Sequence, residues 1–149
     1  MSVHRTIKVL SIFNFLIGFQ LYSAILVIYF AKVTGSFALA MSIFSIIFIS
    51  SAIFEIPTGI FSDMIGRKKT VVLGALSLLL ATIFYALGQS YFILVIGGIL
   101  EGLARSFFSG NNNALLYDSL AAEKKADKYH HYLGKVSSTE QAALASGSR

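Results

Sequence analysis

The chain has 149 residues, of which 56% are hydrophobic and 13% charged, and its formal net charge is +5. Soluble domains carry about 25% charged residues because their surface must be wetted, so this composition predicts that lipid covers much of the chain. Cysteine is absent, which excludes a disulfide, a thiolate nucleophile and a cysteine metal site.

The basic residues lie in short clusters between long apolar runs. Such a distribution is typical of cytoplasmic loops in membrane proteins. Nucleic-acid binding requires instead a basic face with exposed aromatic side chains on a soluble module. We therefore expect the lipid bilayer as a partner, and no nucleic acid.

The first apolar run, at about residues 7–31, is long enough to cross a hydrocarbon core of about 30 Å with some tilt. It exceeds the apolar stretch of a signal peptide, which is about 7–15 residues, and no good small-residue cleavage site follows it. The run therefore predicts a retained membrane span.

Three further apolar runs predict spans at about residues 37–60, 71–87 and 91–111. A hydrophilic, basic link at residues 62–70 separates the first two of these, and a short uncharged turn separates the last two. The predicted fold class is an all-α polytopic membrane protein with four transmembrane helices.

The character of the chain changes after Gly110. Residues 114–134 form an amphipathic, charged stretch whose apolar positions can share one side of a helix, which predicts a cytoplasmic helix at the membrane surface. The segment 142–149 turns small and apolar, as at the start of a fifth span.

Positive residues predict the orientation, because they favour the cytoplasmic side. One side of the predicted membrane would hold Arg5, Lys8, Arg67, Lys68, Lys69, Lys124, Lys125, Lys128 and Lys135. The other side would hold only Lys32. Both the N-terminus and the C-terminal tail are therefore expected in the cytoplasm, with the chain in a plasma or inner membrane.

The link between the second and third predicted spans carries a motif, Gly59-Ile60-Phe61-Ser62-Asp63-Met64-Ile65-Gly66-Arg67-Lys68. It resembles the signature loop of the major facilitator superfamily, glycine-x-x-x-aspartate-x-x-glycine-arginine-basic, which lies between the same two helices in that family. The resemblance implies a loop that latches the two halves of a transporter in the outward-facing state, through Gly59, Asp63, Gly66, Arg67 and Lys68. This chain departs from the pattern at Met64, where a basic residue is usual, and at Phe61 and Val71, which replace leucines.

Two more stretches, residues 54–59 and 109–120, resemble a drug- and metabolite-efflux branch of the superfamily. Together the resemblances imply an incomplete N-terminal domain of that fold, with helices one to four and the approach to helix five.

Charged side chains at membrane depth are costly, by about 2.5–3.5 kcal/mol each on insertion scales, and are therefore functional candidates. Glu101 and Arg105 are four residues apart on one helical face, which Phe108 and Asn112 extend at helical spacing. Helix four lines the central cavity in the family that the chain resembles. Glu101, Arg105 and Asn112 are thus candidates for substrate binding or proton coupling. The alternative is a structural pair that neutralises itself.

In the first span, Asn14, Tyr22 and Tyr29 fall roughly along one stripe. By the same resemblance they are candidates for substrate contact, and interhelical packing is the alternative. Glu55 and Pro57, near the end of the second span, are structural candidates, because the carboxylate can accept hydrogen bonds from the loop or brace backbone groups freed by the proline.

No catalytic triad, phosphate-binding loop or metal-spaced carboxylate set occurs in the sequence, and no third ligand accompanies His130 and His131. We therefore expect no enzymatic activity, no metal and no cofactor.

Transporters of this superfamily hold a small-molecule substrate between two halves of six helices. The four predicted spans favour the N-terminal part of a truncated or split secondary transporter, for small-molecule efflux by proton antiport, which is not expected to transport alone. If the transporter is split, its missing C-terminal helices are expected on another chain. The alternatives are a dimeric four-helix transporter and an interaction partner of another membrane chain.

Overall fold

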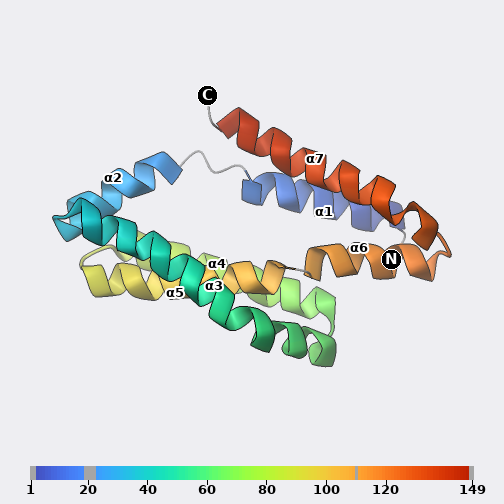
Figure 1. The fold of residues 1–149 in the computed structure, drawn as a ribbon, viewed down its shortest axis with the longest axis horizontal. Coiled ribbons are helices and arrows are strands. Elements are labelled where there is room, and N and C mark those ends of the chain that lie inside the picture. The colour runs from blue at the N-terminus through green and yellow to red at the C-terminus, as the bar shows by residue number, and fades with distance from the viewer. Residues whose placement is uncertain (1–2, 19–22, 110, 148–149) are drawn as a thin grey trace. The chain divides into compact units, whose positions relative to one another are not determined.

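The computed structural model describes residues 3–18, 23–109 and 111–147 (Figure 1). Within these ranges the chain is helical and holds no strand, which confirms the predicted all-α fold class. The helices are α1 (Val3–Gly18), α2 (Ser23–Thr34), α3 (Phe37–Ile65), α4 (Arg67–Leu87), α5 (Tyr91–Phe108), α6 (Asn111–Ala122), the short 3-10 helix η1 (Ala126–Lys128) and α7 (Tyr129–Gly147). They form two compact units, Ala24–Asn111 and the combination of Met1–Ser23 with Asn112–Arg149.

Helices α3, α4 and α5 form the centre of the first unit, where α5 packs against both of the others. Small residues allow this close approach. A Cβ at Gly97 would lie 2.6 Å from a ring carbon of Tyr85, and one at Gly102 would lie 2.6 Å from the carbonyl oxygen of Ile47. This unit has a buried apolar cluster to which α2 contributes Phe30. Its other members are Ala40, Ile43, Tyr85 and Leu94.

Gly66 alone joins α3 to α4. Its φ of +90° lies in the region that favours glycine. Its N–H donates to the carbonyl oxygen of Ser62 (2.9 Å), and its carbonyl accepts from the N–H of Thr70 (3.3 Å). The hydrophilic link predicted at 62–70 is therefore mostly helical, because a single glycine makes the turn and the basic residues after it are good helix formers.

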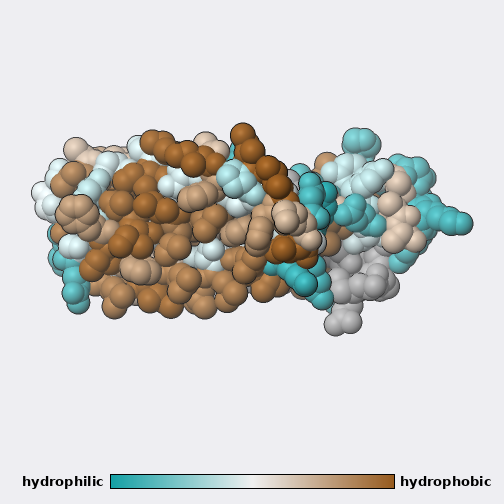
Figure 2. Space-filling model, turned by 90° about the horizontal axis from the view of Figure 1, so that it is seen from below, coloured by the Kyte–Doolittle hydropathy of each residue, from teal (hydrophilic) through white to brown (hydrophobic). Residues whose placement is uncertain are grey.

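The outer surface of this unit is apolar. Figure 2 shows hydrophobic side chains over much of it, and large exposed ones follow α3 from Ile53 to Met64. By length and composition, three helices in the described ranges can cross a membrane: α3, α4 and the stretch that begins at Tyr91. The second and third predicted spans lie within α3 and α4, whereas the fourth, 91–111, includes Gly110, which lies outside the described residues, so its continuity stays a prediction. The first predicted span, 7–31, includes residues 19–22, which lie outside the described residues, so its continuity stays a prediction.

The second unit is built from α1, α6, η1 and α7, with α1 packed along α7. Its buried core is Leu116, Leu120 and Val136, against which Ile7 of α1 and Leu133 of α7 pack. The amphipathic helix predicted at 114–134 is divided here between α6 and α7. The N–H groups of Lys124 and Lys125 bond back to carbonyls of α6 (3.0 and 2.9 Å), which ends that helix.

The turn after α6 carries an exposed ion pair between Lys125 and Glu123, with Nζ and Oε2 2.9 Å apart. The hydrogen bond and the negative charge of Glu123 raise the pKa of the Lys125 ammonium group. Lys124 adopts a positive φ of 57° in the same turn. The helix that follows, α7, continues through residues 142–147, where the start of a fifth span was predicted.

Candidate functional site

Glu101 and Arg105, the two charged side chains within α5, form an ion pair. Nη2 of Arg105 lies 2.8 Å from Oε1 of Glu101, and Nε lies 3.1 Å from the same oxygen. The side chain of Glu101 is 16% exposed and that of Arg105 39% exposed. The spacing of four residues, recognised in the sequence, therefore does bring the two charges together on one face.

Two other helices complete this cluster. From α4, the hydroxyl of Tyr85 donates to Oε2 of Glu101 at 2.8 Å. From α3, the ring of Phe48 lies with its centroid 5.5 Å from Cζ of Arg105, a cation–π distance. The carboxylate is thus held between a guanidinium group and a hydroxyl, and the cation lies beside an aromatic face. We refer to Phe48, Tyr85, Glu101 and Arg105 as the charged cluster.

Tyr29 belongs to the same unit and bonds to the backbone of α4. Its hydroxyl donates to the carbonyl oxygen of Tyr85 at 2.8 Å. Phe30, next to it, packs on the ring of Tyr85 with centroids 5.0 Å apart. These contacts fix α2 to the end of α4. Tyr22, predicted on the same stripe as Tyr29, lies outside the described residues.

Asn14 and Asn112 meet in the second unit. Nδ2 of Asn112, on α6, donates to Oδ1 of Asn14, on α1, at 3.3 Å. The sequence placed Asn112 on the face of Glu101 and Arg105. The structure describes α5 to Phe108 and α6 from Asn111, and Gly110 lies outside the described residues, so a face shared by all three stays a prediction.

The signature-loop residues lie around the junction of α3 and α4. Asp63 of α3 pairs with Arg67 of α4 across Gly66, with 3.4 Å between Oδ1 and Nη2, and Asp63 remains 72% exposed. Lys68 is exposed. Gly59 is exposed as well, and a Cβ built there would meet nothing within 4 Å. The exposed charges leave this surface available for contact.

Asn111, which the sequence analysis did not single out, connects this junction to the start of α6. It is 3% exposed. Its Oδ1 accepts a short hydrogen bond from the hydroxyl of Ser62 and a longer one from Nη1 of Arg67 (3.4 Å), and its Nδ2 donates to the carbonyl of Phe107 (2.8 Å). Its place at the start of a polar triplet that follows the apolar run was the available signal, but the two neighbouring asparagines belong to the same triplet.

Replacing Asn111 with alanine should lower the free energy of unfolding by about 1–3 kcal/mol, because the buried hydroxyl of Ser62 then lacks its acceptor. Equilibrium unfolding of the full chain in mixed micelles measures the change. The exposed neighbour provides the control, since Asn113→Ala removes no buried contact and should change stability by less than about 0.5 kcal/mol. Equal losses from the two variants would contradict the role of Asn111.

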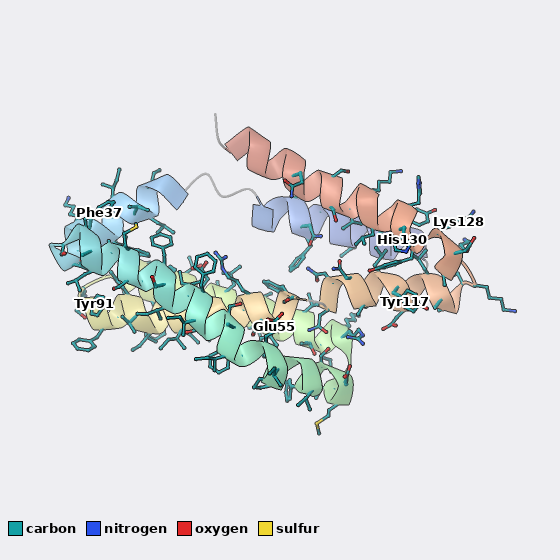
Figure 3. All side chains as sticks on the ribbon, in the orientation of Figure 1. Phe37, Glu55, Tyr91, Tyr117, Lys128 and His130 are labelled. Carbon is teal, nitrogen blue, oxygen red and sulfur yellow. The ribbon has the colours of Figure 1, made fainter. Side chains whose placement is uncertain are left out.

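Glu55 lies in the second half of α3 (Figure 3), and its Oε1 accepts a hydrogen bond from the hydroxyl of Ser109 at 3.0 Å. Pro57 lies inside the same helix and has no N–H to donate. The hydroxyl of Thr58 donates to the carbonyls of Phe54 (2.7 Å) and Ser106 (3.4 Å). Around the proline, α3 is thus fastened to the end of α5 by side chains, in keeping with a structural role.

Within the described residues, no three His, Cys, Asp or Glu side chains gather in a way that could hold a metal ion. His130 is exposed, with its ring 5.4 Å from that of Tyr129 (Figure 3).

Comparison with known proteins identifies the family. The model of the family described as Major Facilitator Superfamily matches residues 9–129. An "Uncharacterized transporter" of Buchnera aphidicola subsp. Schizaphis graminum (strain Sg) is 33% identical over 73 residues, which are 49% of this chain and 18% of that relative. No solved structure matches the chain. The protein is an all-α, multi-pass membrane protein and belongs to the major facilitator superfamily.

Proposed function

We propose that this chain contributes N-terminal helices to a secondary active transporter that exports small molecules in exchange for protons. Family membership and the printed name of the Buchnera relative support transport. The observation that supports coupling of this transport to protons is the charged cluster, in which Arg105 and Tyr85 hold the carboxylate of Glu101 within an apolar helix.

In this proposal the carboxylate of Glu101 is the group that exchanges the proton. While Glu101 is ionised, it neutralises Arg105, which lowers the cost of either charge at membrane depth. A proton at Oε2 removes the negative charge and weakens the ion pair. A substrate that competes for either side chain would thereby be coupled to the proton.

Members of this superfamily hold substrate between two halves of six helices. The described helices by themselves provide only part of one wall of such a site. We therefore propose that transport requires further helices, from additional coding sequence or from another chain. The proposed location is a plasma or inner membrane, with the basic segments, and so both ends of this chain, in the cytoplasm.

Proton movement in membrane vesicles tests this proposal. Everted vesicles are prepared from cells that express the gene together with any coding sequence that follows it, and a panel of lipophilic drugs is added while the internal pH is followed with a dye. Export should release protons from the energised vesicles. Glu101→Gln should reduce that release by at least about tenfold, since it removes a proton-exchanging group.

The exposed loop variant Lys125→Gln serves as the control and should keep full proton release. Unchanged proton release by Glu101→Gln would contradict a coupling role for Glu101. The chain alone in liposomes should show no coupled movement, and strong proton-driven uptake by it would contradict the need for further helices and favour a dimeric four-helix transporter.

A further inference from the structure

One side of the segment formed by η1 and α7 is basic and exposed. Lys128 ends η1, and His131 and Lys135 follow it in α7, three and seven residues later. Residues with this spacing lie on one face of a helix. All three side chains are exposed, and Figure 3 labels the first of them, Lys128. We refer to Lys128, His131 and Lys135 as the basic stripe.

The other side of α7 faces the core of its unit. Val136 is 4% exposed and belongs to the buried cluster, and Leu133 packs against it. These contacts fix the rotation of α7 about its axis. The basic stripe therefore points away from the core of the unit.

The basic stripe carries positive charge that no carboxylate neutralises directly. Among the side chains that the structure describes, neither Lys128 nor Lys135 forms an ion pair. Lys125, in the turn before, differs from them because its Nζ lies 2.9 Å from Oε2 of Glu123. Asp127 supplies the negative charge of η1, one against the two lysines. The stripe thus favours a partner that brings negative charge.

The same unit also exposes apolar side chains, on α1. Lys8, Ile12 and Phe15 share one face of this helix by their spacing, and the two apolar side chains are 51% and 40% exposed. Ile7 packs against the same buried cluster as α7, so α1 begins beside the start of α7 (Figure 1).

A lysine one turn before exposed apolar side chains is typical of a membrane boundary. Its ammonium group reaches the headgroups while the apolar side chains contact the acyl chains. Lys8 and Ile12 have this arrangement, and Lys8 is exposed. Because the chain is a multi-pass membrane protein, this unit favours a lipid surface over a soluble acidic partner.

We propose that the basic stripe binds the headgroup of an anionic phospholipid. The ammonium groups of Lys128 and Lys135 neutralise its negative charge, and a ring N–H of His131 donates to a phosphate oxygen. The two lysines are about 10 Å apart along the helix axis, and their flexible four-carbon stems allow both to reach one headgroup. This inference goes beyond the proposed function, because it concerns lipid selectivity and requires neither substrate nor proton.

Titration of the purified full chain in a neutral detergent tests the proposal. Phosphatidylglycerol or phosphatidylcholine is added, and bound lipid is counted by native mass spectrometry. Both lipids contain a phosphate, but only the first has a net negative charge. The first phosphatidylglycerol should bind at least about fivefold more tightly than the first phosphatidylcholine, the effect expected of one lysine near an anionic surface. High salt should reduce the preference, because it screens exposed charges.

Single lysine variants locate the site on the chain. Lys128→Gln and Lys135→Gln should each weaken phosphatidylglycerol binding by about fivefold and leave phosphatidylcholine binding unchanged. Lys125→Gln is the matched control, because it removes the same charge from a lysine that Glu123 already neutralises. It should change binding by less than about twofold. Lys135→Arg keeps the charge and should bind as wild type does.

Three results would overturn the proposal. Equal binding of the two lipids would show that the chain does not select the anionic headgroup. Equal losses from Lys125→Gln and Lys128→Gln would show attraction to the net charge alone. A preference that survives the double variant Lys128→Gln, Lys135→Gln would place the lipid elsewhere on the chain. The assay involves no transport, so its failure would leave the vesicle experiment unaffected.

Discussion

Replacing Glu101 with alanine should destabilise the protein by about 2–4 kcal/mol, and replacing Arg105 in the same molecule should recover much of that loss. Removing one partner of a buried ion pair leaves an uncompensated charge and costs about 3–5 kcal/mol. Arg105 is 39% exposed, which places the expected loss somewhat below that range. The double variant leaves no unpaired charge, so its loss of stability should be smaller than the sum of the losses in the two single variants.

Equilibrium unfolding of the full chain in mixed micelles would measure the four members of this cycle. The chain offers a control pair with the same spacing, Asp63 and Arg67. Because Asp63 is 72% exposed, Asp63→Ala should cost less than about 1 kcal/mol. If the losses of stability from Glu101→Ala and Arg105→Ala add up in the double variant, the interaction between the two side chains does not contribute to stability.

Tyr85 shows which contacts of the charged cluster could not be predicted from the sequence. Helical spacing was sufficient to place Glu101 beside Arg105, because both lie on one helix. It could not supply Tyr85 from α4 or Phe48 from α3. Those contacts depend on how each helix is rotated about its axis, and helices that are apolar on every side give little indication of rotation.

Helix boundaries show a related limit. The long apolar runs predicted the regions of α3, α4 and α5, since hydropathy alone distinguishes lipid-covered segments. The polar link at 62–70 was expected as a connection, yet α3 and α4 continue through most of it. A polar segment indicates contact with water, but it does not indicate where a helix ends. The end of α3 depends on one glycine, Gly66, with a positive φ.

Asn111 and Asn112 illustrate the same point at the level of single side chains. The sequence presents them as equivalent members of a polar triplet. Asn111 closes the junction of α3 and α4 through Ser62, whereas Asn112 faces Asn14. Only the packed structure distinguishes the two amides, because the distinction depends on partners far away in the sequence.

Replacing Gly102 with alanine should destabilise the protein by about 3 kcal/mol, at the upper end of the range for overpacking. A Cβ at this position would lie 2.6 Å from the carbonyl oxygen of Ile47, 2.6 Å from Cβ of Ser50 and 2.9 Å from the backbone nitrogen of Ser51. All three belong to α3. Two are backbone atoms, and no change of rotamer moves them away.

Helix association in a membrane depends on close van der Waals packing, because lipid tails are as apolar as the side chains that they replace. The alanine therefore forces α3 and α5 apart and loses contacts along both. Gly98 provides a matched control one turn earlier, on the same face of α5. A Cβ there would meet Ile43 at ordinary contact distances of 3.4 and 3.5 Å.

Gly98→Ala should be neutral or stabilising by up to about 1 kcal/mol, since alanine is the better helix former. Unfolding measurements on both variants give the energies. The absence of cysteine allows spin labels to be placed uniquely on α3 and α5, and the distance between them should increase in Gly102→Ala only. Equal stabilities and unchanged label distances in the two variants would show that α3 and α5 do not meet at Gly102. A loss of stability without separation would instead place the cost in a local distortion of the α3 backbone around the added methyl group.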